Sequence, residues 1–425
     1  MFSIMNSFLS VNVLLALAVV VITGRLLGKA LVKIGQPPVI GEVLAGILLG
    51  PSLLGRLFPA LEARLFPEAV TPALGVVAQI GVVLYMFAVG VEFDAAALRR
   101  SAARLVFVSQ ASIAVPFLLG LGIAAFIRPE FGLEGVSPIA FALFMGIAMS
   151  ITAFPVLARI LTDRSLTRTE LGRAALACAA VQDVTAWCLL AIVVGVTRAA
   201  LSSGVNSAVL AAVFIAFMFV IARPLVVRLA RAENAERPSY ETMTWTLAGL
   251  LVSAVVAEAI GIHAIFGAFL YGAILPAESA IGRQLSINRI PVITILFLPA
   301  FFALTGLRTQ IGLVATSRDW AICALITAVA VAGKFGGTLA GGKLVGLEWR
   351  FAALLGILMN TRGLMELVVL NIGLDLGVLS PRLFTMMVIM AIVTTAMTAP
   401  LLDLVTERSP ASSSEPARPP RAVAR

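Results

Sequence analysis

The chain carries little charge. Only 12% of its 425 residues are Asp, Glu, Lys or Arg, while 60% are hydrophobic and the mean hydropathy is +1.05. Soluble domains have about 25% charged residues. The composition therefore excludes a soluble globular protein and predicts an all-α polytopic membrane protein.

Cysteine and histidine are scarce too, with three and one residues respectively. Cys178, Cys188 and Cys323 fall in apolar segments without the spacing of metal ligands, which predicts a role in packing and no bound metal other than a transported cation. His263 follows Gly261 at the start of a segment, where a structural role is favoured over a proton relay. We therefore do not expect a pH sensor built on histidine.

Enzyme motifs are also missing. The sequence has no Walker A loop, no G-x-G-x-x-G after a strand, and no second intramembrane aspartate at protease-like spacing. Neither enzymatic activity nor a cofactor is expected. The net charge of +9 comes from basic residues scattered singly through short loops, a pattern that orients a protein in the bilayer and predicts no nucleic-acid partner.

Thirteen apolar segments are each long enough, or nearly so, to cross a hydrocarbon core of about 30 Å. They span roughly 9–32, 38–55, 73–92, 103–127, 137–161, 171–197, 205–230, 242–260, 262–280, 290–313, 320–342, 350–373 and 380–405. We expect residues 1–405 to form one transmembrane domain. Residues 406–425 are rich in Pro, Ser and Arg, which predicts a disordered tail.

The distribution of Lys and Arg predicts the orientation. With the N-terminus outside, 22 of the 31 basic residues lie on the cytoplasmic side and 7 on the outer side, the other two lying within segments. This bias favours an outer N-terminus and a cytoplasmic C-terminus, with the inner membrane of a bacterium as the expected location.

Asp183 is the most informative residue. It lies twelve residues into the segment 171–197, which contains no other acid, and this places it close to the bilayer midplane. Ionising a carboxylate there costs several kcal/mol or more without water, a cation or a partner, about +2.5 to +3.5 kcal/mol on insertion scales. An intramembrane acid of this kind predicts a functional site.

Two segments are poor continuous helices. Segment 137–161 contains Pro155 in the stretch MSITAFPVLARIL, and segment 350–373 contains Asn360, Thr361 and Gly363 in LMNTRGLMEL. The two are seven segments apart, so they cross the membrane in opposite directions. Interruptions at matching positions of two halves indicate an inverted repeat with a binding site at the breaks.

Lys334 lies near the middle of segment 320–342, at about the depth of Asp183 and of both breaks. A buried ammonium and a buried carboxylate are natural partners, and a static salt bridge between them is the structural alternative to a transport site. A carboxylate in a partly wet cavity binds either a proton or a cation, which is the minimal chemistry of cation/proton exchange. Gln182 and Thr152 are expected to support the site.

Other polar residues fit packing roles as well as function. Arg362 and Glu366 are four residues apart, so they could pair with one another. Arg159 could orient its segment or extend toward the cytoplasmic surface. Packing or interface roles are favoured for three further acids, Glu42, Glu92 and Glu258.

Five stretches resemble the monovalent cation:proton antiporter-2 family, which includes Kef-type potassium efflux systems and plant cation/proton exchangers. They are GQPPVIGEVLAGILLGPSLLG (35–55), LYMFAVGVEFD (84–94), SITAFPVLARIL (150–161), AAVQDVTAWCLLA (179–191) and NTRGLMELVVLNIGLDLGVL (360–379). The third and fifth are most similar to the plant branch.

The resemblance implies a sodium/proton antiporter fold with crossed helices at segments 5 and 12. It implies a dimer panel over 9–92 and 242–313, a moving core over 103–197 and 320–405, and a homodimer. Asp183 would bind the ion and the proton, with Lys334 as counter-charge. Electrogenic relatives carry two adjacent aspartates where this chain has Gln182–Asp183, which favours electroneutral exchange. Kef-type systems also carry a cytoplasmic regulatory domain, so control of that type would need a separate subunit here.

The sequence leaves two alternatives to exchange of K⁺ or Na⁺ for H⁺. One is a potassium efflux pathway on the same fold without strict proton coupling. The other is a carrier of organic anions or other solutes, with Lys334 and Arg362 as the binding charges.

Overall fold

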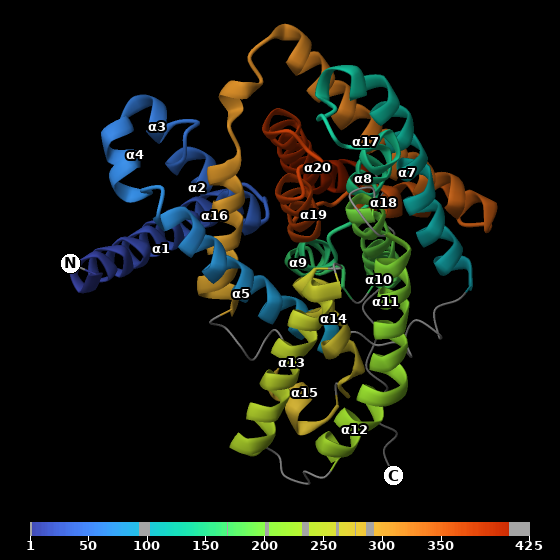
Figure 1. Cartoon of the computed structure of the whole chain (residues 1–425). Coiled ribbons are helices and arrows are strands. Elements are labelled where there is room, and N and C mark those ends of the chain that lie inside the picture. The colour runs from blue at the N-terminus through green and yellow to red at the C-terminus, as the bar shows by residue number, and fades with distance from the viewer. Residues whose placement is uncertain are drawn as a thin grey trace, which may run out of the picture.

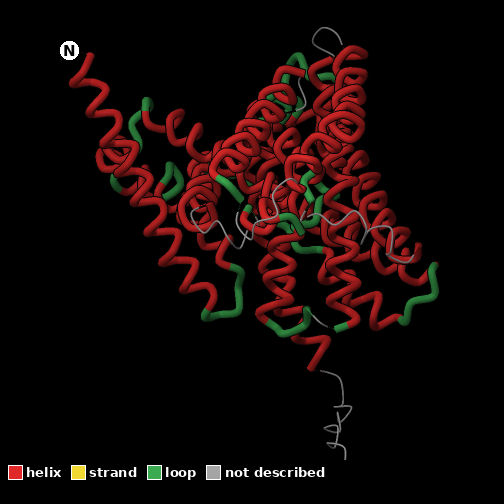
Figure 2. The backbone as a smooth tube through the Cα atoms, turned by 90° about the horizontal axis from the view of Figure 1, so that it is seen from below, coloured by secondary structure: helices red, strands yellow, loops and turns green. Residues whose placement is uncertain are grey.

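A computed structural model describes residues 2–92, 103–167, 169–199, 204–231, 238–260, 263–276, 278–285 and 293–407. This part of the chain is helical and contains no β-strand (Figures 1 and 2). It holds ten helices long and apolar enough to cross a membrane, with three shorter apolar helices at 138–148, 264–274 and 349–359. Together these match the thirteen predicted segments, and the predicted fold class is confirmed.

The helices follow one another closely along the chain. Their bounds are α1 (Phe2–Val32), α2 (Pro38–Leu49), α3 (Leu54–Leu57), α4 (Pro59–Leu65), α5 (Val70–Glu92), α7 (Ala103–Phe131), α8 (Pro138–Ala148), α9 (Phe154–Asp163), α10 (Glu170–Ala199), α11 (Gly204–Phe217), α12 (Arg223–Arg231), α13 (Tyr240–Ile260), α14 (Ala264–Ile274), α15 (Ala280–Gln284), α16 (Leu298–Arg308), α17 (Ser317–Leu344), α18 (Trp349–Met359), α19 (Leu364–Asp375) and α20 (Pro381–Glu407).

Some boundaries differ from the prediction. The segment predicted over 262–280 ends as α14 at Ile274, because Leu275 adopts an extended backbone before Pro276. The short helices α3 and α4 were not predicted. Helix α20 continues to Glu407, and the rest of the predicted tail lies outside the described residues.

Two π-helical turns each end two residues before a proline. The turn η1 (Met218–Ala222) precedes Pro224, and η3 (Ile293–Phe297) precedes Pro299. Proline has no N–H for the helical hydrogen-bond pattern and clashes with the preceding turn. The helix therefore widens there into a π-helical turn and then continues as an α-helix. This explains why segments 205–230 and 290–313 span a membrane length despite their prolines.

The helices pack as two groups (Figure 1). The first helix group consists of α1, α2, α5, α13, α14 and α16, and the second of α7 to α10 and α17 to α20. Helices α11 and α12 connect them, since α11 packs on both α10 and α13. The groups also meet where α16 packs against α19.

Small residues hold the second helix group together. Gly333, Gly337 and Gly341 recur every four residues on the face of α17 that packs along α7. A Cβ at Gly337 would lie 2.7 Å from the Ala111 carbonyl oxygen and 2.9 Å from the Val115 Cβ. Close approach of this kind is how helices associate in lipid, where apolar burial supplies no driving force.

We expect Gly337→Ala to destabilise the protein, because its methyl group meets backbone that cannot yield. Overpacking of this kind costs about 1–3 kcal/mol. Gly336 is the matched control, since a Cβ there meets nothing within 4 Å. Gly336→Ala should leave stability unchanged or raise it by up to about 1 kcal/mol, through better helix propensity. Thermal unfolding in detergent compares the two variants. Equal melting temperatures would contradict the packing argument.

Candidate functional site

Two interrupted helices cross at the centre of the second helix group. Residues 149–153 separate α8 from α9, and residues 360–363 separate α18 from α19. The Ala153 N–H donates to the Thr361 carbonyl at 2.9 Å, and the Thr152 hydroxyl donates to the Met359 carbonyl at 2.7 Å. The predicted breaks are therefore present, and backbone carbonyls that the helices leave unpaired accept hydrogen bonds across the crossing, one from a backbone N–H and one from a hydroxyl.

Local chemistry explains where the helices stop and restart. Pro155 lies in the first turn of α9, where its missing N–H costs no helical hydrogen bond. Gly363 immediately precedes α19, and a Cβ there would lie 2.6 Å from Cγ2 of Val156. A larger residue at this position would force Val156 to shift, because the two broken helices approach closely.

Asp183 lies on α10 beside this crossing. Its side chain is buried, with 5% exposure, and its Oδ1 has no hydrogen-bond donor among the described residues. The Asn360 Oδ1, in the break before α19, is likewise buried and unpaired in the described part of the chain. Gln182 and Met359, which directly precede Asp183 and Asn360 in the chain, are in contact, and this contact brings Asp183 and Asn360 into the same region. Buried oxygens without donors are rare in proteins and suit cation ligation.

Lys334 reaches the site from α17 and pairs there with an amide. Its Nζ donates to the Gln182 Oε1 at 2.9 Å, and Gln182 Nε2 donates to the Met359 sulfur at 3.4 Å. Within the described residues, no ion pair joins Lys334 to Asp183, although the two charges interact electrostatically. The static salt bridge that was the structural alternative to a transport site is thus not formed among the described residues, because the neutral amide next to Asp183 accepts from the ammonium.

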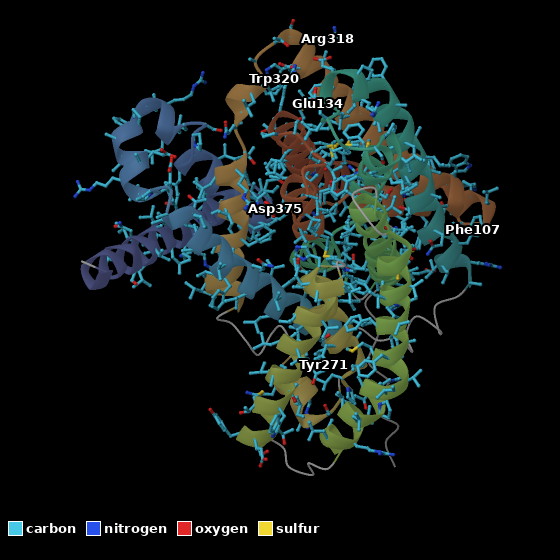
Figure 3. The ribbon with its side chains drawn as sticks, in the orientation of Figure 1. Phe107, Glu134, Tyr271, Arg318, Trp320 and Asp375 are labelled. Atoms are coloured by element: carbon cyan, nitrogen blue, oxygen red, sulfur yellow. The ribbon has the colours of Figure 1, made fainter. Side chains whose placement is uncertain are left out.

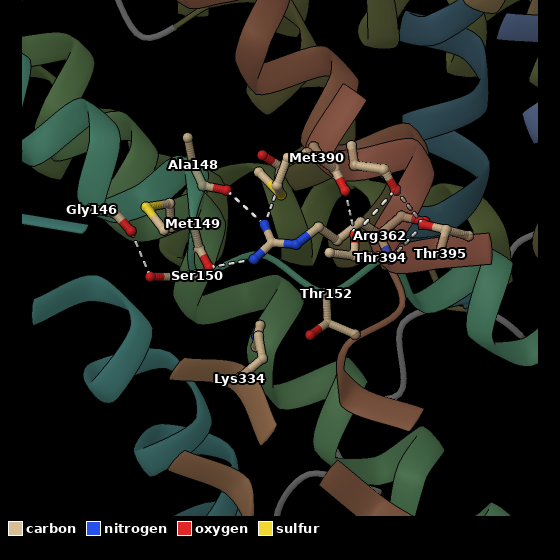
Figure 4. A network of polar contacts seen from close by, with 12 residues as sticks. Gly146, Ala148, Met149, Ser150, Thr152, Lys334, Arg362, Met390, Thr394 and Thr395 are labelled. Atoms are coloured by element: carbon tan, nitrogen blue, oxygen red, sulfur yellow. Dashed lines mark hydrogen bonds and ion pairs between the residues drawn. The ribbon is translucent and has the colours of Figure 1, made fainter. Parts of the chain in front are cut away.

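Arg362 and Glu366 form the predicted pair, with the Nη1 and Oε2 atoms 2.8 Å apart and both side chains fully buried. The guanidinium also donates to the carbonyls of Ala148 at 2.9 Å and Met149 at 2.7 Å (Figure 4). These carbonyls lie at the C-terminal end of α8, which carries partial negative charge. Arg362 therefore stabilises the end of one broken helix from the break of the other.

A threonine of α20, Thr395, contributes unexpectedly to this arrangement. The Thr395 hydroxyl accepts from the Arg362 N–H at 3.1 Å and donates to the Arg362 carbonyl at 2.8 Å. Thr394 is fully buried beside it (Figure 4). The sequence did not single out Thr395. The polar run TTAMT within an apolar helix was the available signal.

The remaining predicted residues lie at the edge of the site or away from it. The Pro155, Arg159 and Glu92 side chains lie outside the described residues. Glu258 Oε2 accepts from the Ala264 N–H at 2.8 Å, and His263 Nδ1 accepts from the Ile265 N–H, so both groups cap the start of α14. The structural role expected of His263 fits this contact.

Two broken helices that cross beside a buried carboxylate are typical of one class of polytopic membrane protein, the secondary transporters with discontinuous helices. The chain belongs to the sodium/hydrogen exchanger family, whose transmembrane model matches residues 14–404. The resemblance seen in the sequence is thereby confirmed.

Individual proteins agree with this assignment. The chain is 45% identical to the Na⁺/H⁺ antiporter NhaS4 of Synechocystis over 92% of its own length and 97% of that protein. It is 39% identical to cation/H⁺ antiporter 18 of Arabidopsis thaliana over 92% of its length. It spans about half of that plant protein, 48%.

The fold matches a solved structure. The sodium proton antiporter MjNhaP1 of Methanocaldococcus jannaschii superposes with a TM-score of 0.65, covering 93% of this chain and 99% of that one. The sequence identity is 14%, so the likeness establishes the fold.

Proposed function

We propose that this chain is a secondary active antiporter that exchanges K⁺ or Na⁺ for H⁺, with Asp183 binding the cation and the proton in turn. The observation that carries the proposal is the buried Asp183 carboxylate, whose Oδ1 lacks a donor among the described residues at the crossing of two broken helices. The names of the relatives, an Na⁺/H⁺ and a cation/H⁺ antiporter, support the same chemistry.

Coupling follows from the cost of a bare charge. An ionised carboxylate in an apolar barrier costs several kcal/mol, about 3 kcal/mol on insertion scales. Protonation or cation binding neutralises Asp183 and removes this cost, and one carboxylate does not hold both ligands at once. Only the two loaded forms therefore move easily, which links cation flux to proton flux in the opposite direction.

The exchange is electroneutral in this proposal. One carboxylate carries one proton or one cation, and electroneutral exchange requires in addition that Lys334, which donates to Gln182, does not release a proton during the cycle. The contacts also argue against an organic-anion carrier. Arg362 donates to two carbonyls and is paired with the Glu366 carboxylate, so its charge is already matched by an acid of the same chain.

Further parts of the proposal concern assembly and orientation. We propose that the first helix group is a dimer panel, that the second is the moving core, and that two copies form a homodimer. The N-terminus faces outside and the C-terminus the cytoplasm of a bacterial inner membrane, supported by the 22-to-7 distribution of basic residues.

Proteoliposomes with an imposed pH gradient test the function. K⁺, Na⁺, Li⁺ or Rb⁺ is added in turn, with the membrane potential clamped. We expect a cation-triggered pH change that does not depend on the clamp, with the apparent cation affinity falling as protons on the same side increase. Cation flux without proton movement would contradict the proposal and favour the uncoupled efflux pathway.

A further inference from the structure

A ladder of polar side chains crosses the boundary between the two helix groups. Thr305 and Arg308 lie on one face of α16, and Asn371 and Asp375 lie on the opposing face of α19. Arg308 Nη1 donates to Asn371 Oδ1 at 3.0 Å and to Asp375 Oδ1 at 2.9 Å. Asn371 Nδ2 donates to the Thr305 hydroxyl at 2.8 Å. The spacings of three and four residues align both pairs along their helices.

This ladder is unlike the other polar contacts of the boundary. Arg308–Asp375 is the sole ion pair that joins the two groups within the described ranges. The other hydrogen bonds across the boundary are single and neutral, from the Gln310 N–H to Thr385 and from Gln36 to the Ala396 carbonyl. The Ala396 carbonyl is available because Pro400, four residues later, has no N–H to donate.

A cavity of about 360 Å³ lies directly beside the ladder. Its walls come from α5, α14 and α16 of the first helix group and from α19 of the second, and Arg308, Asn371 and Asp375 line it. The side chains of Arg308 and Asp375 are 32% and 58% exposed, whereas Thr305 is fully buried. Figure 3 shows Asp375 where α16 and α19 run side by side. Water therefore reaches one end of the ladder, and the other end is dry.

We propose that this ladder is a latch, which holds α19 against α16 in the present conformation and opens and re-forms once in each transport cycle. The proposal rests on the proposed function, because only alternating access requires the two groups to move. A slide of one helical turn, about 5.4 Å, would break every contact of the ladder. The exposed Arg308–Asp375 pair separates at a small cost in free energy, because water can solvate both charges.

The second helix group offers a contrast in its own ion pairs. Arg382 binds both Glu130 and Asp319, and Arg318 binds Glu130 at 3.1 Å. These contacts join α7, α17 and α20 within one group, so relative movement of the groups leaves them intact. The latch is thus the charged contact that movement must break.

A reversible cross-link tests the latch. Thr305→Cys and Asn371→Cys are introduced together, and a short thiol-specific reagent joins them. The native cysteines are first replaced by serine, namely Cys178, Cys188 and Cys323. We expect cation/proton exchange to fall by more than about tenfold on linking and to recover on reduction, because a locked two-state element carries no flux.

The matched control links two residues inside the second helix group. The hydroxyls of Ser112 on α7 and Thr338 on α17 are 2.8 Å apart, as close as the Thr305–Asn371 contact. The protein with Ser112→Cys and Thr338→Cys, linked in the same way, should exchange ions as fast as it does after the link has been reduced. Exchange at an unchanged rate in the linked Thr305/Asn371 variant would overturn the latch.

A second measurement separates the latch from the proposed function. Absence of exchange in the wild-type protein would overturn the proposed function. The latch is then judged separately, by labelling a cysteine placed at Ile372 with a membrane-impermeant maleimide. Asp375→Asn should speed labelling by up to about fivefold, as expected for an exposed pair. Combining Arg308→Asp with Asp375→Arg should restore the slower rate. Unchanged labelling in Asp375→Asn would overturn the latch.

Discussion

Asp183→Asn should abolish cation/proton exchange in proteoliposomes, lowering the rate at least about a hundredfold. Asparagine has nearly the same shape but neither binds a proton nor neutralises a cation. Losing about 3 kcal/mol of charge compensation corresponds to roughly two orders of magnitude in rate. The measurement is the cation-triggered pH change under a clamped membrane potential.

Stability distinguishes this loss from misfolding. Because the Asp183 carboxylate is buried without a hydrogen-bond donor on Oδ1 among the described residues, the neutral amide should leave the melting temperature unchanged or raise it. Asp403→Asn is the matched control. Asp403 lies near the end of α20, is 49% exposed and pairs with Arg164 at 2.8 Å, and its loss should leave exchange intact. Wild-type exchange in Asp183→Asn would show that Asp183 is structural.

Arg362→Met should be the most destabilising substitution at the crossing. It leaves the Glu366 carboxylate buried without its cation and removes the donors of the Ala148 and Met149 carbonyls. Breaking a buried pair from one side costs about 3–5 kcal/mol. We expect a lower melting temperature and a smaller fraction of folded protein in size-exclusion chromatography.

Two variants control for this prediction. Glu366→Gln keeps both contacts of Arg362 with the Ala148 and Met149 carbonyls, so it should lower the melting temperature clearly less than Arg362→Met does. Arg350 is exposed and donates only to the Val405 carbonyl among the described residues, so Arg350→Met should change stability by less than about 0.5 kcal/mol. Equal effects of Arg362→Met and Arg350→Met would mean that the guanidinium does not hold the crossing together.

The interruptions could be located from sequence because their causes are local. Pro155 has no N–H for a helical hydrogen bond and so fits best at the start of a helix, and the run from Asn360 to Gly363 combines weak helix formers with a glycine. Asp183 stood out for a similar reason, since a lone acid in a membrane-length apolar run is costly wherever its neighbours lie.

The contacts between those residues could not be located in this way. Lys334 and Asp183 were placed at one depth as natural partners, with a direct salt bridge as the structural alternative, yet depth does not determine which way a helix face points. The rotation of α17 is set by the glycine face that packs along α7, and it brings Lys334 to Gln182. Arg308 and Asp375 are 67 residues apart, and no local pattern links them.

The sequence by itself determined the membrane class, the thirteen segments, the two breaks and the central acid. Apolar length, helix-breaking residues and charge burial act on each segment separately. Only the tertiary structure decided which polar groups meet at the crossing and which contacts join the two helix groups. Those contacts depend on how each helix is rotated and how closely it packs against segments far apart in the chain. Small residues and the shape of the facing helix surfaces determine both the rotation and the packing.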